Sequence, residues 1–306
     1  MTIDLARPAQ RNQMLPAPPR RGVLLTVSAL SLVVVLGAAV GLVADARLIT
    51  GVPAWIKPLK FAVSIAVYCV TLAWLLTLVQ GRRRLVRTVA WVSGLALALE
   101  LVLILTQVVR GTTSHFNAAT PFDRAVFGAM GGLVALVFLA AAVTAVLLTR
   151  QRGLAPVLAS GIRGGLLVSL LGMAEAGLMI ANRSGGAAGG HTVGSPDGGP
   201  GLPLTGWSTE HGDLRVSHFV GLHALQLLPL LAWLLQRYVS RLGVVTGVRL
   251  VRLATVACAG TVVLLAWQAE RGLPLLRPDA AVLAAAVLGG GLVAAAAATV
   301  LRGRRA

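Results

Sequence analysis

The stretch WSTEHGDLRVSHFVGLHALQ, residues 207–226, joins a group of ionisable side chains to the start of a long apolar run. The ionisable residues are Glu210, His211, Asp213, Arg215, His218 and His223. The last two lie inside the apolar run, whose length and composition predict a membrane-spanning helix. Ionisable groups within a membrane are costly and usually face a bundle interior or a wet cavity. The stretch therefore predicts a transmembrane fold and a candidate polar site.

The composition of the whole chain agrees with a membrane protein. Hydrophobic residues make up 57% and charged residues 12% of the sequence, and the mean hydropathy is +0.83. The net charge of +17 is high, but the basic residues stand in short clusters between apolar runs. Such clusters are typical of the ends of membrane helices rather than of a nucleic-acid surface. The lipid bilayer is the expected partner, and nucleic acid is not.

Repeated apolar runs near twenty residues predict an all-α, polytopic transmembrane bundle of about eight spans within residues 22–301. Residues 1–21 form a basic tail predicted to be disordered, and residues 302–306 form a second basic tail. A Gly-rich loop, 183–206, is predicted to be mobile, with His191 in solvent. The first run exceeds the roughly 7–15 apolar residues of a signal peptide, so we expect an uncleaved helix. The predicted spans are residues 23–44, 55–80, 89–109, 125–148, 161–181, 214–236, 250–267 and 280–301.

Charge asymmetry predicts the orientation of the bundle. Most of the 27 lysines and arginines fall in the two tails and in alternate loops, which the positive-inside rule assigns to the cytoplasm. Both termini are then cytoplasmic, and the histidines lie in outer loops or outer halves of helices. The Arg-, Ala- and Gly-rich composition favours a bacterial plasma membrane as the localisation.

Helical projection at about 100° per residue places polar side chains of several spans in stripes. In the third span, Ser93, Glu100 and Gln107 recur at seven-residue spacing. His218 and His223 are separated by about 140° around the sixth span, so they cannot point at one spot. The stripes together predict an outward-facing polar cavity lined by Lys60, Tyr68, Glu100, Gln107, Glu175, Asn182, His223 and Gln226.

Depth suggests which of these residues meet. At a rise of about 1.5 Å per residue, Glu100 and His223 lie on the order of 15 Å from the outer surface and are predicted partners. Lys60 and Glu175 lie at a shallower level and are predicted to form an ion pair. The alternatives stay open: the lysine can extend to the interface as an anchor, and the buried acids can be protonated structural groups.

Three segments resemble a known group of proteins. WIKPLKF (55–61), RGTTSHFN (110–117) and HGDLRVSHFVGLHALQ (211–226) are similar to stretches of uncharacterised multi-pass integral membrane proteins of actinobacteria. The resemblance covers about residues 50–240 and implies no activity.

Three functions fit these residues. The first is a metal or haem b centre for redox or hydrolytic chemistry, because imidazole and carboxylate groups are suitable ligands. The second is proton-coupled or solute transport, with a small molecule or ion as ligand. The third is a non-catalytic accessory or assembly protein with unidentified protein partners. The candidate metal ligands are His115, His211, Asp213, His218 and His223.

Overall fold

The computed structural model describes residues 22–184, 186 and 188–303 of the chain. The predicted tail 1–21 and residues 304–306 lie outside this range. The longer helices are α1 (Val23–Ala44), α2 (Ile56–Thr77), α3 (Arg83–Val109), α4 (Pro121–Arg150), α5 (Pro156–Ala174), α7 (Leu214–Arg237), α9 (Val244–Glu270) and α10 (Ala280–Arg302). The short elements are α6 (Ala176–Ala181), α8 (Val239–Leu242), β1 (Leu48–Ile49), β2 (Val52–Pro53), β3 (Thr192–Val193) and β4 (Gly212–Asp213).

The prediction of an all-α membrane bundle is confirmed. Eight helical segments in the described part of the chain are long and apolar enough to cross a membrane, with α5 and α6 forming one span, Pro156–Ala181, interrupted at Glu175. The third and seventh spans begin about two turns earlier than predicted. Arginine is a good helix former, so the basic residues before each apolar run continue the helix beyond the hydrocarbon.

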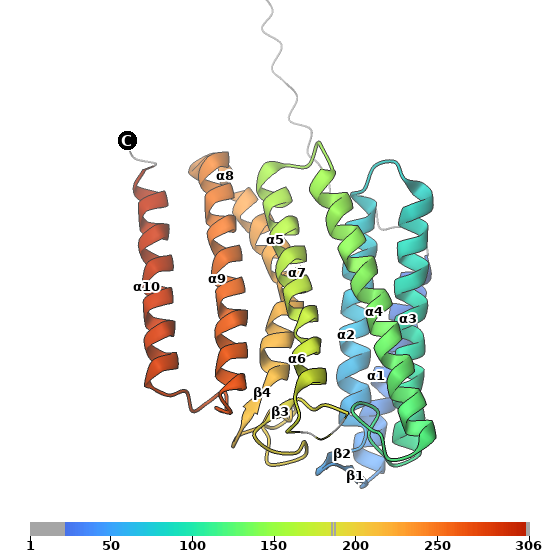
Figure 1. The fold of residues 1–306 in the computed structure, drawn as a ribbon. Helices are drawn as coiled ribbons and strands as arrows, with labels where there is room; N and C mark the ends of the chain where they lie inside the picture. Colours follow the sequence, from blue (N-terminus) through green and yellow to red (C-terminus); the bar gives the residue numbers. More distant parts are fainter. Residues whose placement is uncertain (1–21, 185, 187, 304–306) are drawn as a thin grey trace, which may run out of the picture.

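The long helices run side by side and form two groups (Figure 1). Helices α1, α2, α3 and α4 pack together, and α5 and α7 pack on each other and on α9. Helix α10 contacts α9 at the edge of the bundle and buries only Val282 among its side chains. Buried residues of α2, α4, α5 and α7, including Leu75, Leu148, Ile162 and Leu225, form one apolar cluster that joins the two groups.

All four strands lie at one end of the bundle, which we call the cap face; α10 ends at the opposite end, the arginine face (Figure 1). Strands β1 and β2 form a small hairpin, and β3 pairs with β4 through Thr192 opposite Asp213. The β3–β4 pair ties the Gly-rich loop to the start of α7. The described part of the segment predicted to be mobile is therefore tied to the bundle at Thr192 and Val193.

Helices α5 and α7 approach closely because glycines face each other. A Cβ atom added to Gly172 would lie 2.7 Å from Cα of Gly221, and one added to Gly221 would lie 2.5 Å from Cα of Gly172. A Cβ at Gly165 would lie 2.8 Å from the carbonyl oxygen of Ala224. Small residues at such contacts let membrane helices gain van der Waals contact along their backbones.

We expect Gly172→Ala to separate α5 from α7, because the added methyl group meets backbone atoms that have no room to move. Overpacking of this kind costs about 1–3 kcal/mol, which thermal unfolding of the detergent-solubilised protein would register as a lower melting temperature. Gly131→Ala in α4 is the matched control, since no described atom outside its own stretch of helix backbone lies within 4 Å of its Cβ position. Equal melting temperatures for the two variants would contradict the close contact.

Candidate functional site

Beneath the cap face, polar side chains from both helix groups converge. They come from the cap-face halves of α2, α3 and α7, from the α5–α6 junction, and from the loops that follow α3 and α6. We call this set the cap cluster: Lys57, Lys60, Glu100, His115, Glu175, His191, Asp197, Asp213, Arg215 and His218.

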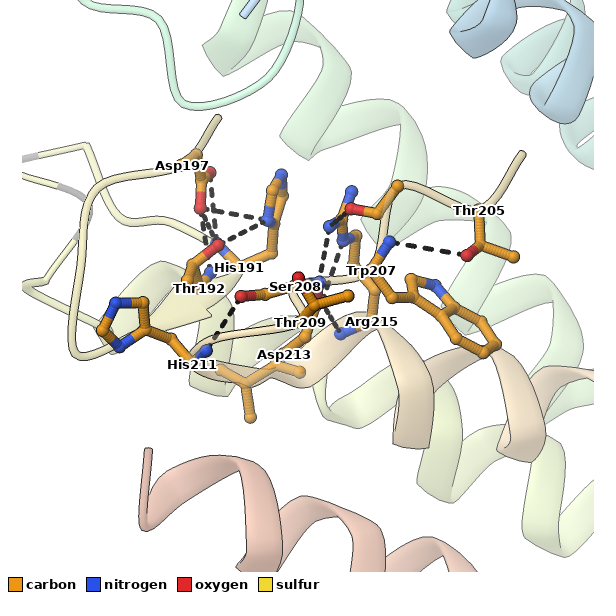
Figure 2. Close-up of polar contacts among 12 residues, drawn as sticks. His191, Thr192, Asp197, Thr205, Trp207, Ser208, Thr209, His211, Asp213 and Arg215 are labelled. Carbon is orange, nitrogen blue, oxygen red and sulfur yellow. Dashed lines mark hydrogen bonds and ion pairs between the residues drawn. The ribbon is translucent and has the colours of Figure 1, made fainter. Parts of the chain in front are cut away.

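Asp213 and Arg215 anchor the long loop to α7 (Figure 2). Asp213 is 2% exposed and caps the helix by accepting a hydrogen bond from the backbone N–H of Arg215. The guanidinium group donates to both carboxylate oxygens, at 2.9 and 2.6 Å, and also to the carbonyl oxygen of Gly206. The backbone N–H of Ser208 donates to the same carboxylate at 2.8 Å. Asp213 therefore holds the loop and has no oxygen left for a metal ion.

Lys60 makes a second anchor between the groups. Its Nζ atom donates to the carbonyl oxygen of Thr205 at 2.7 Å. The predicted Lys60–Glu175 ion pair was wrong, because the loop supplies the acceptor for the lysine. The second carboxyl oxygen of Glu175 has no hydrogen-bond partner among the described residues.

His191 and Asp197 form a pair within the long loop (Figure 2). The two atoms Nδ1 and Oδ1 lie 3.0 Å apart, and the backbone N–H groups of His191 and Thr192 also donate to Oδ1. Although burial alone raises the pKa of Asp197, these hydrogen bonds lower it to about 2. Burial lowers the pKa of His191 in spite of the neighbouring carboxylate. The prediction of a solvated His191 was wrong: its side chain is 22% exposed and its ring packs against Phe116.

Glu100 is the least satisfied group of the cluster. It is 2% exposed, and neither carboxyl oxygen has a hydrogen-bond partner in the described part of the chain. The nearest ionisable neighbour is His115, whose Nε2 atom lies 3.6 Å from Oε1; the two form an ion pair only when the imidazole is protonated. The His115 ring packs on Phe61, with 5.3 Å between ring centroids. Burial, followed by the positive charge of Lys57, lowers the pKa of His115 well below its ordinary value.

The two histidines of α7 take different environments. His218 turns into the bundle, where its Nδ1–H group donates to the carbonyl oxygen of Gly172 at 2.7 Å. The side chain of His223 is exposed and does not face the interior of the bundle, so its predicted contact with Glu100 was wrong. The angle between the two side chains explains the outcome: when α7 packs on α5 with Ala224 and Leu225 buried, only one of the histidines can face inward.

The other predicted cavity residues serve mainly to connect elements. Gln107 is buried and donates to Asp123 at 2.9 Å. Asn182 donates to the carbonyl oxygens of Gly190 and Thr192. The remaining two lie between the helix groups: Tyr68 packs against apolar clusters of both groups, and Gln226 donates to Thr71 of α2 while its carbonyl oxygen has no partner among the described residues.

The predicted metal ligands His115, His211, Asp213, His218 and His223 are not brought together. Within residues 22–184, 186 and 188–303, no group of three or more His, Cys, Asp and Glu side chains could hold a metal ion. Figure 2 shows the His211 ring directed away from the Asp213–Arg215 pair. The His191–Asp197 pair was not predicted from the sequence. The pattern that indicates it is a carboxylate that follows a histidine across the turn-forming segment VGSP, residues 193–196.

Comparisons of the chain with protein-family models, with curated proteins and with solved structures gave no match.

We expect Asp213→Asn to loosen the cap, because it leaves the partly buried Arg215 guanidinium without its counter-charge. Breaking a buried pair costs roughly 3–5 kcal/mol, and the loop 182–211 should gain rapid amide hydrogen exchange. Asp279→Asn is a matched control, since Asp279 also caps a helix and pairs with an arginine, Arg271, but in a more exposed position. That pair should contribute only about 0–1 kcal/mol, and equal effects would contradict the anchoring role of Asp213.

Acidification from about pH 7.5 to about pH 5.5 should also loosen the cap, because the folded protein keeps His115 and His191 neutral. Their lowered pKa values mean that the unfolded cap binds more protons, so stability is full above the ordinary histidine pKa of about 6.5 and falls as the pH decreases below it. Hydrogen exchange of the loop at the two pH values, corrected for intrinsic rates, measures this. The decrease in the free energy of loop opening between the two pH values should be smaller in His191→Gln. It should stay unchanged in the control His223→Gln.

Proposed function

We propose that this protein is a proton-coupled membrane transporter in which Glu100 is the group that gains and loses the proton. The observation that carries the proposal is the environment of its carboxyl group. It is buried between helices, has no hydrogen-bond partner among the described residues, and lies 3.6 Å from a histidine nitrogen.

A buried carboxylate without hydrogen bonds is unfavourable, and such a group tends to hold a proton instead. A base close to the carboxyl group gives the proton a second position to occupy. His115 lies on the cap-face side of Glu100 and its side chain is 24% exposed, so it connects the acid to the loops. Lys57 lies within range of a direct electrostatic interaction with Glu100. Charge on the lysine disfavours the protonated form of both the acid and the imidazole, so it favours release of the proton from the pair.

The distribution of arginine supports an orientation for the proposed transporter. The arginine face carries Arg82, Arg83, Arg84, Arg87, Arg150, Arg152, Arg237, Arg241, Arg249, Arg252 and Arg302 at helix ends. The positive-inside rule assigns this face to the cytoplasm. The cap face and the Glu100–His115 pair would then face outward from a bacterial plasma membrane, and protons would enter through the cap.

The decisive measurement uses purified protein in liposomes that contain a trapped pH-sensitive dye, with a potassium gradient and valinomycin to drive proton entry. We expect the wild type to carry a proton flux and Glu100→Gln to reduce it by at least ~100-fold, the scale of a positioned proton-transfer group. Infrared titration of the same samples should show a carboxylic-acid band that titrates in the wild type and is absent in Glu100→Gln.

Glu175→Gln is the matched control, because it removes a second buried carboxyl group that has no ion pair with a histidine among the described residues, and it should retain the flux. A normal flux and an unchanged infrared band in Glu100→Gln would sink the proposal. Stoichiometric metal in the purified protein would favour a metal centre instead. That alternative has one supporting feature: His191 and His218 each direct Nδ1 at an oxygen atom, as metal-ligating histidines do.

A further inference from the structure

A cavity of about 330 Å³ opens near the arginine face, far from the cap cluster. It lies between the first turn of α1, the last turns of α2 and the first turns of α3. Its volume falls within the range of about 300–1,000 Å³ typical of ligand pockets. The apolar wall includes Val23, Leu24, Ala73, Leu76, Val86 and Ala90.

Two arginines stand at the opening of this cavity. Arg83 and Arg87 both contribute to its lining and lie one turn apart on α3, so their side chains share one face of the helix. Both side chains are exposed, and neither guanidinium group has a hydrogen bond or an ion pair with any residue that the structure describes. Arg82 and Arg84 add positive charge nearby, and the lining contains no Asp or Glu.

We propose that this cavity binds an anionic phospholipid, with an acyl chain against the apolar wall and the phosphate group on Arg83 and Arg87. The arginines lie in the first two turns of α3, at one end of its candidate span, whereas Ala73, Leu76 and Ala90 lie further inside the spans of α2 and α3. We infer that the arginines lie at the level of the headgroups. Guanidinium groups match phosphate oxygens in geometry and charge. Basic pockets between membrane helices are suited to acidic headgroups, and the apolar wall accounts for the rest of the ligand.

This cavity differs from the rest of the positively charged arginine face. Arg249 and Arg252 also lie exposed, one turn apart, near the start of a membrane helix, α9. They do not line the cavity. They offer similar attraction to an acidic bilayer surface but no apolar space beside it, so they should not hold one lipid specifically.

The test is thermal unfolding of the full chain in a neutral detergent, titrated separately with dioleoyl phosphatidylglycerol, dioleoyl phosphatidylcholine and inorganic phosphate. We expect saturable stabilisation by phosphatidylglycerol alone, and native mass spectrometry should retain one such lipid per chain. Arg83→Gln combined with Arg87→Gln should raise the half-saturating concentration of phosphatidylglycerol by on the order of 30-fold, because each arginine contributes about 1 kcal/mol to binding. Arg249→Gln with Arg252→Gln should leave it within about twofold.

A second variant tests the apolar half of the site. Ala90→Phe keeps both arginines and places a ring in the cavity, so it should also weaken phosphatidylglycerol binding. Equal stabilisation by inorganic phosphate would overturn the proposal, as would an equal loss in the α9 variant or unchanged binding in Ala90→Phe. The arginine substitutions are at exposed positions, and size-exclusion chromatography verifies that each variant is folded before titration.

Discussion

Polar groups between membrane-spanning helices must find their partners inside the protein, because hydrocarbon offers them none. Most of the polar side chains beneath the cap face obey this constraint. Asp213 is surrounded by donors from Arg215 and Ser208, and His218 donates to a carbonyl oxygen of α5. Such contacts fix the helices relative to one another, so the polar groups contribute to the fold as well as to the candidate site.

Glu100 departs from this pattern, and the departure gives it a functional interpretation. Ser93 and Gln107 in the same stripe of α3 are also buried. Gln107 has a partner in Asp123, whereas the hydroxyl group of Ser93 and both carboxyl oxygens of Glu100 have none among the described residues. Of these two, only Glu100 is ionisable. A purely structural acid at this depth would be expected to accept hydrogen bonds. A group that exchanges a proton needs a titratable neighbour in place of fixed hydrogen bonds, and His115 is such a neighbour.

The cap loops connect the two helix groups at the same end. Lys60 of α2 holds Thr205 of the long loop, and Phe116 packs against His191. Loops from separate groups therefore meet above Glu100, so a movement of one group against the other would change the surroundings of the acid. The cavity beside Arg83 and Arg87 lies entirely within the first group, at the opposite face. A lipid bound there would brace α1, α2 and α3 without touching the proposed proton site at Glu100.

The sequence by itself determined the eight spans, their approximate ends and the polar stripe of α3. These depend on apolar length and on helical period, both of which are local properties. Only the tertiary structure decided the partners. His115 rather than His223 meets Glu100, Thr205 rather than Glu175 meets Lys60, and His191 pairs with Asp197. Helical period gives the directions of side chains on one helix, but partners on other elements depend on how α5 and α7 pack and on the path of the Gly-rich loop. Neither of those has a periodic signal in the sequence.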